Sequence, residues 1–160
     1  MYLDAMEFLE EERDAWAPYE ALADLSDEQL SVAIDGAHGW SGRDLMAHML
    51  AWQGVSLDAA KELAVGETSP TIARVDADWE ARGGDVVNEE ITRKWAAVPM
   101  EDLLKRFRTQ PGELRGYLTV VPETRWVKHA EHLKSFHDET IAHYADHADD
   151  LEAILAAARS

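Results

Sequence analysis

The 160-residue chain contains no cysteine. Disulfide bonds, thiolate metal ligands and a protein thiol nucleophile are therefore excluded, and any thiol chemistry requires a thiol from outside the chain. Basic residues are also scarce, because 15 Lys and Arg stand against 32 Asp and Glu, for a formal net charge of −17. Nucleic acids and anionic membrane surfaces are bound through clustered positive charge, so we predict neither as a partner.

Long apolar runs are missing too. None approaches the roughly 20 residues that a membrane-spanning helix needs, and the N-terminal segment carries acids where a signal peptide carries basic residues. Both absences favour a cytoplasmic location. Hydrophobic residues still make up 46% of the chain, which is enough for a buried core in one domain. We find no linker, and we predict a single domain over residues 1–160.

Nearly all apolar stretches have helical rather than alternating spacing, so we predict an all-α fold. The expected first helix runs from about Tyr2 to Ala23, with Leu3 and Met6 on its apolar side and a bend or break near Pro18. The expected later helices start at Ser41, Asp76, Pro99 and Leu133. They end, in the same order, near Gly66, Val98, Leu118 and Ala158. The helix that starts at Asp76 is interrupted at Gly83-Gly84, and the helix that starts at Pro99 continues beyond Pro111. Thr68–Pro70 is expected to be a loop.

Two segments have the sequence of a capping box. Ser26-Asp-Glu-Gln29 should open a short helix before a turn at residues 35–39, and Ser41-Gly-Arg-Asp44 should open the helix that carries His48. Asp44 has two interpretations. We expect it to cap the helix, and the alternative is that it orients His48 from one turn away.

Three histidines on two distant helical segments indicate chemistry. His143 and His147 are four residues apart and therefore project from one helix face. His48 lies between Leu45 and Trp52 on another apolar stripe. If these rings converge, they form a three-nitrogen metal site with an open coordination position, as in catalytic zinc centres. The alternative is that all three are hydrogen-bonded core histidines, or that His143 and His147 lie at the solvent edge of their stripe.

Several other residues are open to two interpretations. Four tryptophans at helical spacing can line a pocket or fill the core: Trp40, Trp52, Trp79 and Trp95. Four arginines can bind a substrate carboxylate, and the spacing selects none of them: Arg43, Arg82, Arg106 and Arg125. Three further histidines are expected in loops or at the surface: His129, His132 and His137. Of these, only His137 is a candidate for substrate contact.

The run Gly39-Trp-Ser-Gly-Arg-Asp-Leu-Met-Ala-His-Met-Leu-Ala-Trp52 resembles the W-S-x-x-D-x-x-x-H-x-x-x-W signature of the DinB/YfiT-like superfamily. This group includes the N-terminal domains of mycothiol-dependent maleylpyruvate isomerases. The segment Glu139-Thr-Ile-Ala-His-Tyr-Ala-Asp-His147 is similar to the H-x-x-x-H motif on the last helix of the same group. The two motifs lie at the expected ends of a chain of the expected length.

The resemblance implies a four-helix bundle of DinB type with a long crossover connection. It also implies a divalent metal, zinc or nickel, held by His48, His143 and His147, and a homodimer formed through helix faces. Some isomerase relatives have Glu at the position of His143. The chain lacks the additional C-terminal domain of the longer isomerases, so the resemblance does not extend to isomerisation of maleylpyruvate.

These observations predict a metal-dependent enzyme that acts on a small electrophilic molecule, either as a thiol-dependent transferase or as a hydrolase. The catalytic group would be a metal-bound water or an external low-molecular-weight thiol, because three neutral imidazoles leave the metal its full positive charge. The alternative is a non-catalytic, small-ligand-binding or stress-related helical-bundle protein, because a fold determines its scaffold more firmly than its chemistry.

Overall fold

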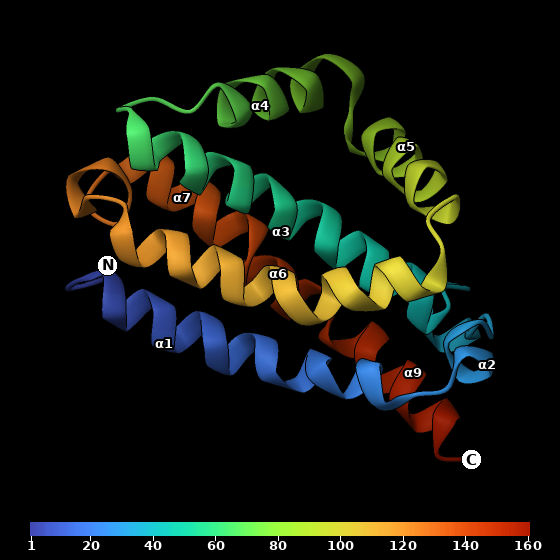
Figure 1. The fold of residues 1–160 in the computed structure, drawn as a ribbon. Helices are drawn as coiled ribbons and strands as arrows, with labels where there is room; N and C mark the ends of the chain where they lie inside the picture. The colour runs from blue at the N-terminus through green and yellow to red at the C-terminus, as the bar shows by residue number, and fades with distance from the viewer.

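A computed structural model describes all 160 residues, and the chain is all-helical with no strand in a sheet. Figure 1 shows four helical segments running alongside one another: α1 (Ala5–Trp16), α3 (Gly42–Val65), α6 (Met100–Val120) and the segment from α7 (Ala130–Glu139) to α9 (Ala148–Ala158). Helices α4 (Pro70–Arg82) and α5 (Gly84–Ala96) lie over α3. Helix α3 (Gly42–Val65) is central, since it packs against α4, α5, α6, α7 and α9. None of the helices combines the length and the apolar character that a bilayer-spanning segment needs.

The N-terminal region is shorter and more broken than predicted. Helix α1 (Ala5–Trp16) begins after Asp4, whose side chain accepts a hydrogen bond from the Glu7 amide. Leu3 therefore precedes the helix. Both it and Met6 are exposed, so their prediction as part of the apolar side of the first helix was wrong. The expected break near Pro18 is present as a change to a 3₁₀ helix, η1 (Ala17–Asp24).

Both predicted capping boxes are formed. In the first, Ser26 and Gln29 exchange side-chain and backbone hydrogen bonds at the start of α2 (Asp27–Leu30). The chain then turns through η2 (Asp35–Ala37), where His38 and Gly39 both have positive φ. In the second, Ser41 and Asp44 make the same exchange and fix the first turn of α3, which ends at Gly66 as expected.

Helix α4 (Pro70–Arg82) starts six residues before the predicted Asp76, so the loop assignment of Thr68–Pro70 was wrong at its last residue. The Ser69 hydroxyl caps the helix by accepting from the Ile72 amide, and Pro70 occupies a position where its missing N–H costs nothing. The Glu62 carboxylate on α3 accepts from Ser69 and Thr71. These bonds tie the start of α4 to the last turns of α3, seven to nine residues earlier in the chain.

Helix α5 (Gly84–Ala96) follows the predicted interruption at the two glycines. Helix α6 (Met100–Val120) continues through Pro111 as predicted and ends two residues beyond Leu118. After η3 (Glu123–Arg125), the expected last helix is in fact three helices. These are α7 (Ala130–Glu139), α8 (Ile141–Asp146) and α9 (Ala148–Ala158), with breaks at Thr140 and His147.

The buried core has two apolar clusters, one around Trp16, Phe107 and Leu151, the other around Phe8, Leu114 and Trp126. Buried polar residues on several helices link these clusters. They form one hydrogen-bonded chain across α1, α8, α3 and α6, made by Glu12, Tyr144, Gln53 and Gln110. At the α1 end of this hydrogen-bonded series, Glu12 also forms an ion pair of 2.6 Å with Arg115 on α6.

A candidate metal centre

Three imidazole rings meet where α3 faces the C-terminal segment. His48 lies on α3 and is buried, and its Nε2 is 3.0 Å from the Nε2 of His143 on α8. Each pair of rings among His48, His143 and His147 has a centroid separation of 4.8 Å. One nitrogen from each ring can be chosen so that all three atoms lie within 4.8 Å of one another. The predicted convergence of the two motifs is therefore present.

The backbone breaks lie on either side of α8 and help to set this geometry. Thr140, whose hydroxyl donates to the Phe136 carbonyl, ends α7, and the chain resumes its helix one residue later. His147 itself lies at the second break, with φ −105° and ψ 9°. The His147 amide still donates to the His143 carbonyl, so the two side chains keep the one-turn relation that their spacing predicts.

An acidic side chain orients the third ring. His147 Nδ1 donates to Asp150 Oδ2 at 2.9 Å, which leaves Nε2 of that ring with a free lone pair. The same carboxylate accepts from His38 Nδ1 at 2.8 Å, and Asp150 is buried. The Trp40 ring stacks on His147 with centroids 5.5 Å apart. Asp150 was not among the predicted site residues, although its position one turn after His147 was a usable signal.

Burial keeps two of the rings neutral. Desolvation lowers the pKa of His48 to about 4, with a further lowering from His147. Desolvation likewise lowers the pKa of His143 to about 3, and the two neighbouring histidines lower it further. The neutral form is the one that binds metals, because it has an unprotonated ring nitrogen.

His48, His143 and His147 fit a divalent cation that prefers nitrogen ligands. The Nδ1 atoms of His48 and His143 are buried and have no hydrogen-bond partner. Their Nε2 atoms are turned toward each other, so one of the two must carry a proton when no ion lies between them. Three histidines with a carboxylate behind one of them form the ligand chemistry of zinc and nickel sites.

The site opens to a pocket of about 370 Å³. Its walls include Trp40, Trp52 and Trp79, and Trp95 lines a different pocket, so the pocket interpretation holds for all four tryptophans. Glu139, which was not predicted as a site residue either, also lines the pocket. Burial, reinforced by Asp138 and Asp76, raises the pKa of Glu139 to about 8. This carboxyl can therefore hold a proton near neutral pH.

The remaining candidate residues lie outside this pocket. Asp44 caps α3, and the structure gives it no hydrogen bond to His48. Arg43 donates to the carbonyls of Trp95 and Val98, and Arg125 donates to the Leu63 carbonyl, so both tie helices together.

Arg82 and Arg106 line a different pocket. Among the surface histidines, His129 caps α7 and the His132 ring bonds the Arg125 carbonyl. The third, His137, packs near Tyr2 and lines a separate pocket. It is therefore not in the triad pocket.

Comparison with protein families gives one match. Residues 9–139 match the mycothiol maleylpyruvate isomerase N-terminal domain. The chain belongs to this family. The matched range includes His48 and the tryptophans around it but stops before His143 and His147. No curated protein and no solved structure matches the chain. The family membership agrees with the resemblance found in the sequence, and the triad itself is a finding of the structure.

Proposed function

We propose that this isomerase-family domain is a divalent-metal-dependent enzyme whose ligands are His48, His143 and His147. The observation that carries the proposal is the convergence of the three rings, 4.8 Å apart, at the wall of a pocket. Two buried imidazoles whose Nε2 atoms lie 3.0 Å apart must share one proton while no ion lies between them, and an ion bound by both atoms removes that constraint.

The proposed reaction is transfer of an external thiol to a small electrophile, or hydrolysis of that electrophile. A zinc or nickel ion held by three neutral imidazoles would supply a Lewis acid that lowers the pKa of a water or a thiol. The thiol must be a separate molecule, because the chain has no cysteine.

The side chains of the pocket have complementary roles in this proposal. Asp150 keeps the proton of His147 on Nδ1, so that Nε2 faces the other two rings. The three tryptophans supply an apolar wall for the body of the substrate. The Glu139 carboxyl would exchange a proton with the substrate, since its pKa of about 8 lies near neutral pH.

The finer predictions on architecture belong to the same proposal. We interpret α1, α3, α6 and the α7–α9 segment as a four-helix bundle of DinB type, with α4 and α5 in its long crossover connection. A single domain over residues 1–160, a cytoplasmic location and a homodimer remain predictions. The rival function is a non-catalytic ligand-binding or stress-related protein, which would bind a ligand in the same pocket without turning it over.

Metal analysis combined with one substitution tests the proposal. Protein purified without chelators should contain one zinc or nickel ion per chain. It should consume an alkylating electrophile such as monobromobimane in the presence of a low-molecular-weight thiol, or hydrolyse an activated ester. In His147→Ala, metal affinity should fall by more than about 100-fold, the upper end of the cost of losing an outer-shell partner, and activity should vanish.

The matched control is His132→Ala, which removes a histidine outside the triad and should keep metal and activity. Circular dichroism should show the same helicity in wild type and both variants, because helix packing does not depend on the ion. Full activity in a metal-free His147→Ala protein would end the metalloenzyme proposal.

A further inference from the structure

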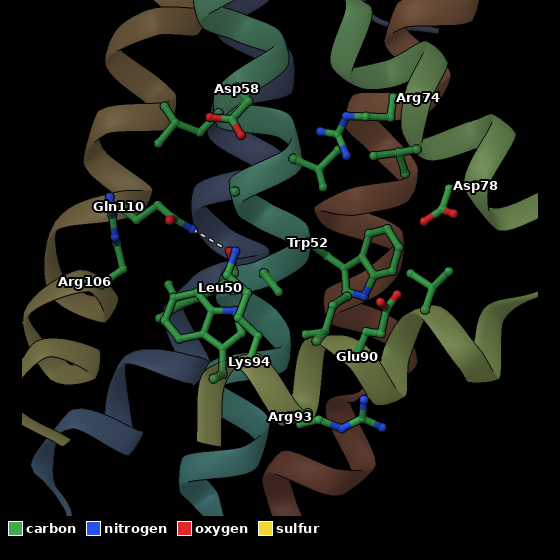
Figure 2. Close-up of a pocket in the computed structure, with 18 of the residues that line it drawn as sticks. Leu50, Trp52, Asp58, Arg74, Asp78, Glu90, Arg93, Lys94, Arg106 and Gln110 are labelled. Atoms are coloured by element: carbon green, nitrogen blue, oxygen red, sulfur yellow. Dashed lines mark hydrogen bonds between the residues drawn. The ribbon is translucent and has the colours of Figure 1, made fainter. Parts of the chain in front are cut away.

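A second, larger pocket lies between α3, α4, α5 and α6. It measures about 760 Å³, and Figure 2 shows Arg74 on α4, Lys94 on α5 and Arg106 on α6 around Leu50 and Trp52 of α3. Helix α5 has no fully buried residue, and α4 buries only Thr71 and Ile72. Apolar side chains of these helices are therefore left facing the pocket, namely Val75, Val87, Ile91 and Trp95.

The charge of this pocket is opposite to that of the protein. Six of the chain's 15 basic residues line it, against three acidic ones, in a molecule of net charge −17. Arg82 forms ion pairs with Asp78 and Glu90, two of those three acids. Four of the other basic residues have no carboxylate within ion-pair distance, although the chain has 32 acids: Lys61, Arg74, Lys94 and Arg106.

Trp52 separates this pocket from the histidine triad. Its side chain lines both pockets, is buried, and is held by a hydrogen bond of 3.0 Å from Nε1 to Asn88 Oδ1 on α5. Trp79 packs against it edge-on. None of the three histidines lines the larger pocket. A ligand on this side of Trp52 would therefore be bound without the metal.

We propose that the pocket between α3, α4, α5 and α6 binds a small organic anion, a molecule with a carboxylate or phosphate group on an apolar body. Arg74 and Arg106 lie on opposite sides of the pocket, and one of the two binds the anionic group, because a guanidinium bonds an oxyanion through two parallel N–H groups. The apolar body covers the sides of Val75, Val87, Ile91 and Trp95 that face the pocket. This site does not depend on the proposed metal chemistry.

Isothermal titration with three probes of one shape tests the charge requirement: 2-naphthoate, 2-naphthyl phosphate and neutral 2-naphthamide. We expect saturable binding of at least one anion, at least about tenfold tighter than that of the amide. The tighter anion identifies the preferred group. Added NaCl should weaken binding of the anions, since salt screens exposed charges, and leave the amide unchanged.

Substitutions locate the site. In the double variant Arg74→Gln and Arg106→Gln, affinity for the anion should fall about tenfold, because the guanidinium that binds it is removed whichever of the two it is. The control, Arg13→Gln with Lys105→Gln, makes the same change in net charge outside the pocket and should stay within about twofold of wild type. The indole N–H resonances of Trp52 and Trp95 should shift on binding, and those of the distant, buried Trp16 and Trp126 should not.

Equal affinity for the amide and the anions, or an equal loss in the control variant, would overturn the proposal. So would resonance shifts confined to tryptophans outside the pocket. Titration of His147→Ala separates this proposal from the metal site. Anion binding should persist in that variant, and its disappearance there would mean that the triad, not this pocket, binds the anion.

Discussion

At the scale of single residues, Asp150 orients one ring of the triad although it is not one of the three proposed ligands. It accepts hydrogen bonds from two histidines, His147 and the otherwise exposed His38. An imidazole bonded in this way has one tautomer and one orientation, which raises its affinity as a ligand. His48 and His143 have no such partner at Nδ1. Orientation of the site by hydrogen bonding is therefore concentrated on His147.

Replacement of this carboxylate should weaken metal binding without removing a ligand. In Asp150→Ala we expect zinc affinity, measured by competition with a chromogenic chelator, to fall about 10- to 100-fold. Asp149→Ala is the matched control, because its neighbouring carboxylate is exposed and contacts neither ring. Equal losses in the two variants would mean that only the local negative charge matters, and no loss in either would remove Asp150 from the site.

At the scale of helices, the hydrogen-bonded chain of Glu12, Tyr144, Gln53 and Gln110 joins α1, α8, α3 and α6. Hydrogen bonds require a defined geometry, so they orient these helices more specifically than apolar contacts do. Glu12 on α1 is fully buried, bonds the Tyr144 hydroxyl on α8, and pairs with Arg115 on α6. Tyr144 is adjacent to His143 in sequence and also accepts from Gln53 on α3. These bonds fix the rotation of α8 about its axis, and thereby the direction of the metal-binding rings relative to α3.

Loss of Glu12 should therefore be costly. In Glu12→Ala, Arg115 loses its partner in a largely buried position, and we expect the free energy of unfolding to fall by about 3 kcal/mol in urea titrations. The exposed Glu10→Ala on the same helix should change it by less than about 0.5 kcal/mol. A Glu12→Ala protein as stable as wild type would show that the network adds orientation but no net stability.

At the scale of the whole molecule, the ionisable side chains around the triad change the free energy of unfolding with pH, and Glu139 acts in the opposite direction to His48 and His143. Glu139 binds its proton more tightly when folded, with a pKa of about 8 against 4.5. Since the folded state then holds more protons, stability falls as pH rises through that window. His48 and His143 act in the opposite sense, because their lowered pKa values make stability rise with pH from about 4 to 6.5. Between roughly pH 6.5 and 8 the effect of Glu139 dominates.

In metal-free protein, the free energy of unfolding should therefore fall by about 1–2 kcal/mol between pH 6.5 and 8. Glu139→Gln removes the titrating group, so its stability should be nearly constant over this range. Glu131→Gln, an exposed acid on the same helix that does not line the pocket, is the control and should keep the wild-type slope. An unchanged slope in Glu139→Gln would show that this carboxyl ionises freely in the folded protein.

Features that depend on neighbouring residues could be predicted from the amino-acid order. Helical spacing indicated the all-α fold, and the two capping boxes located the starts of α2 and α3, because these bonds span only three residues. The spacing of His143 and His147 placed both on one face, and the resemblance joined them to His48. The absence of cysteine and the shortage of basic residues restricted the possible chemistry through composition alone.

Features that depend on contacts between distant segments were fixed by the tertiary fold. The breaks around α8 interrupt a continuous helical pattern, and the second role of Asp150 comes from His38, 112 residues away. The concentration of basic side chains in one pocket is likewise contributed by four helices. Local sequence specifies which residues can form a helix. Which side chains share a pocket, and how burial changes their pKa, is settled by the packing of those helices.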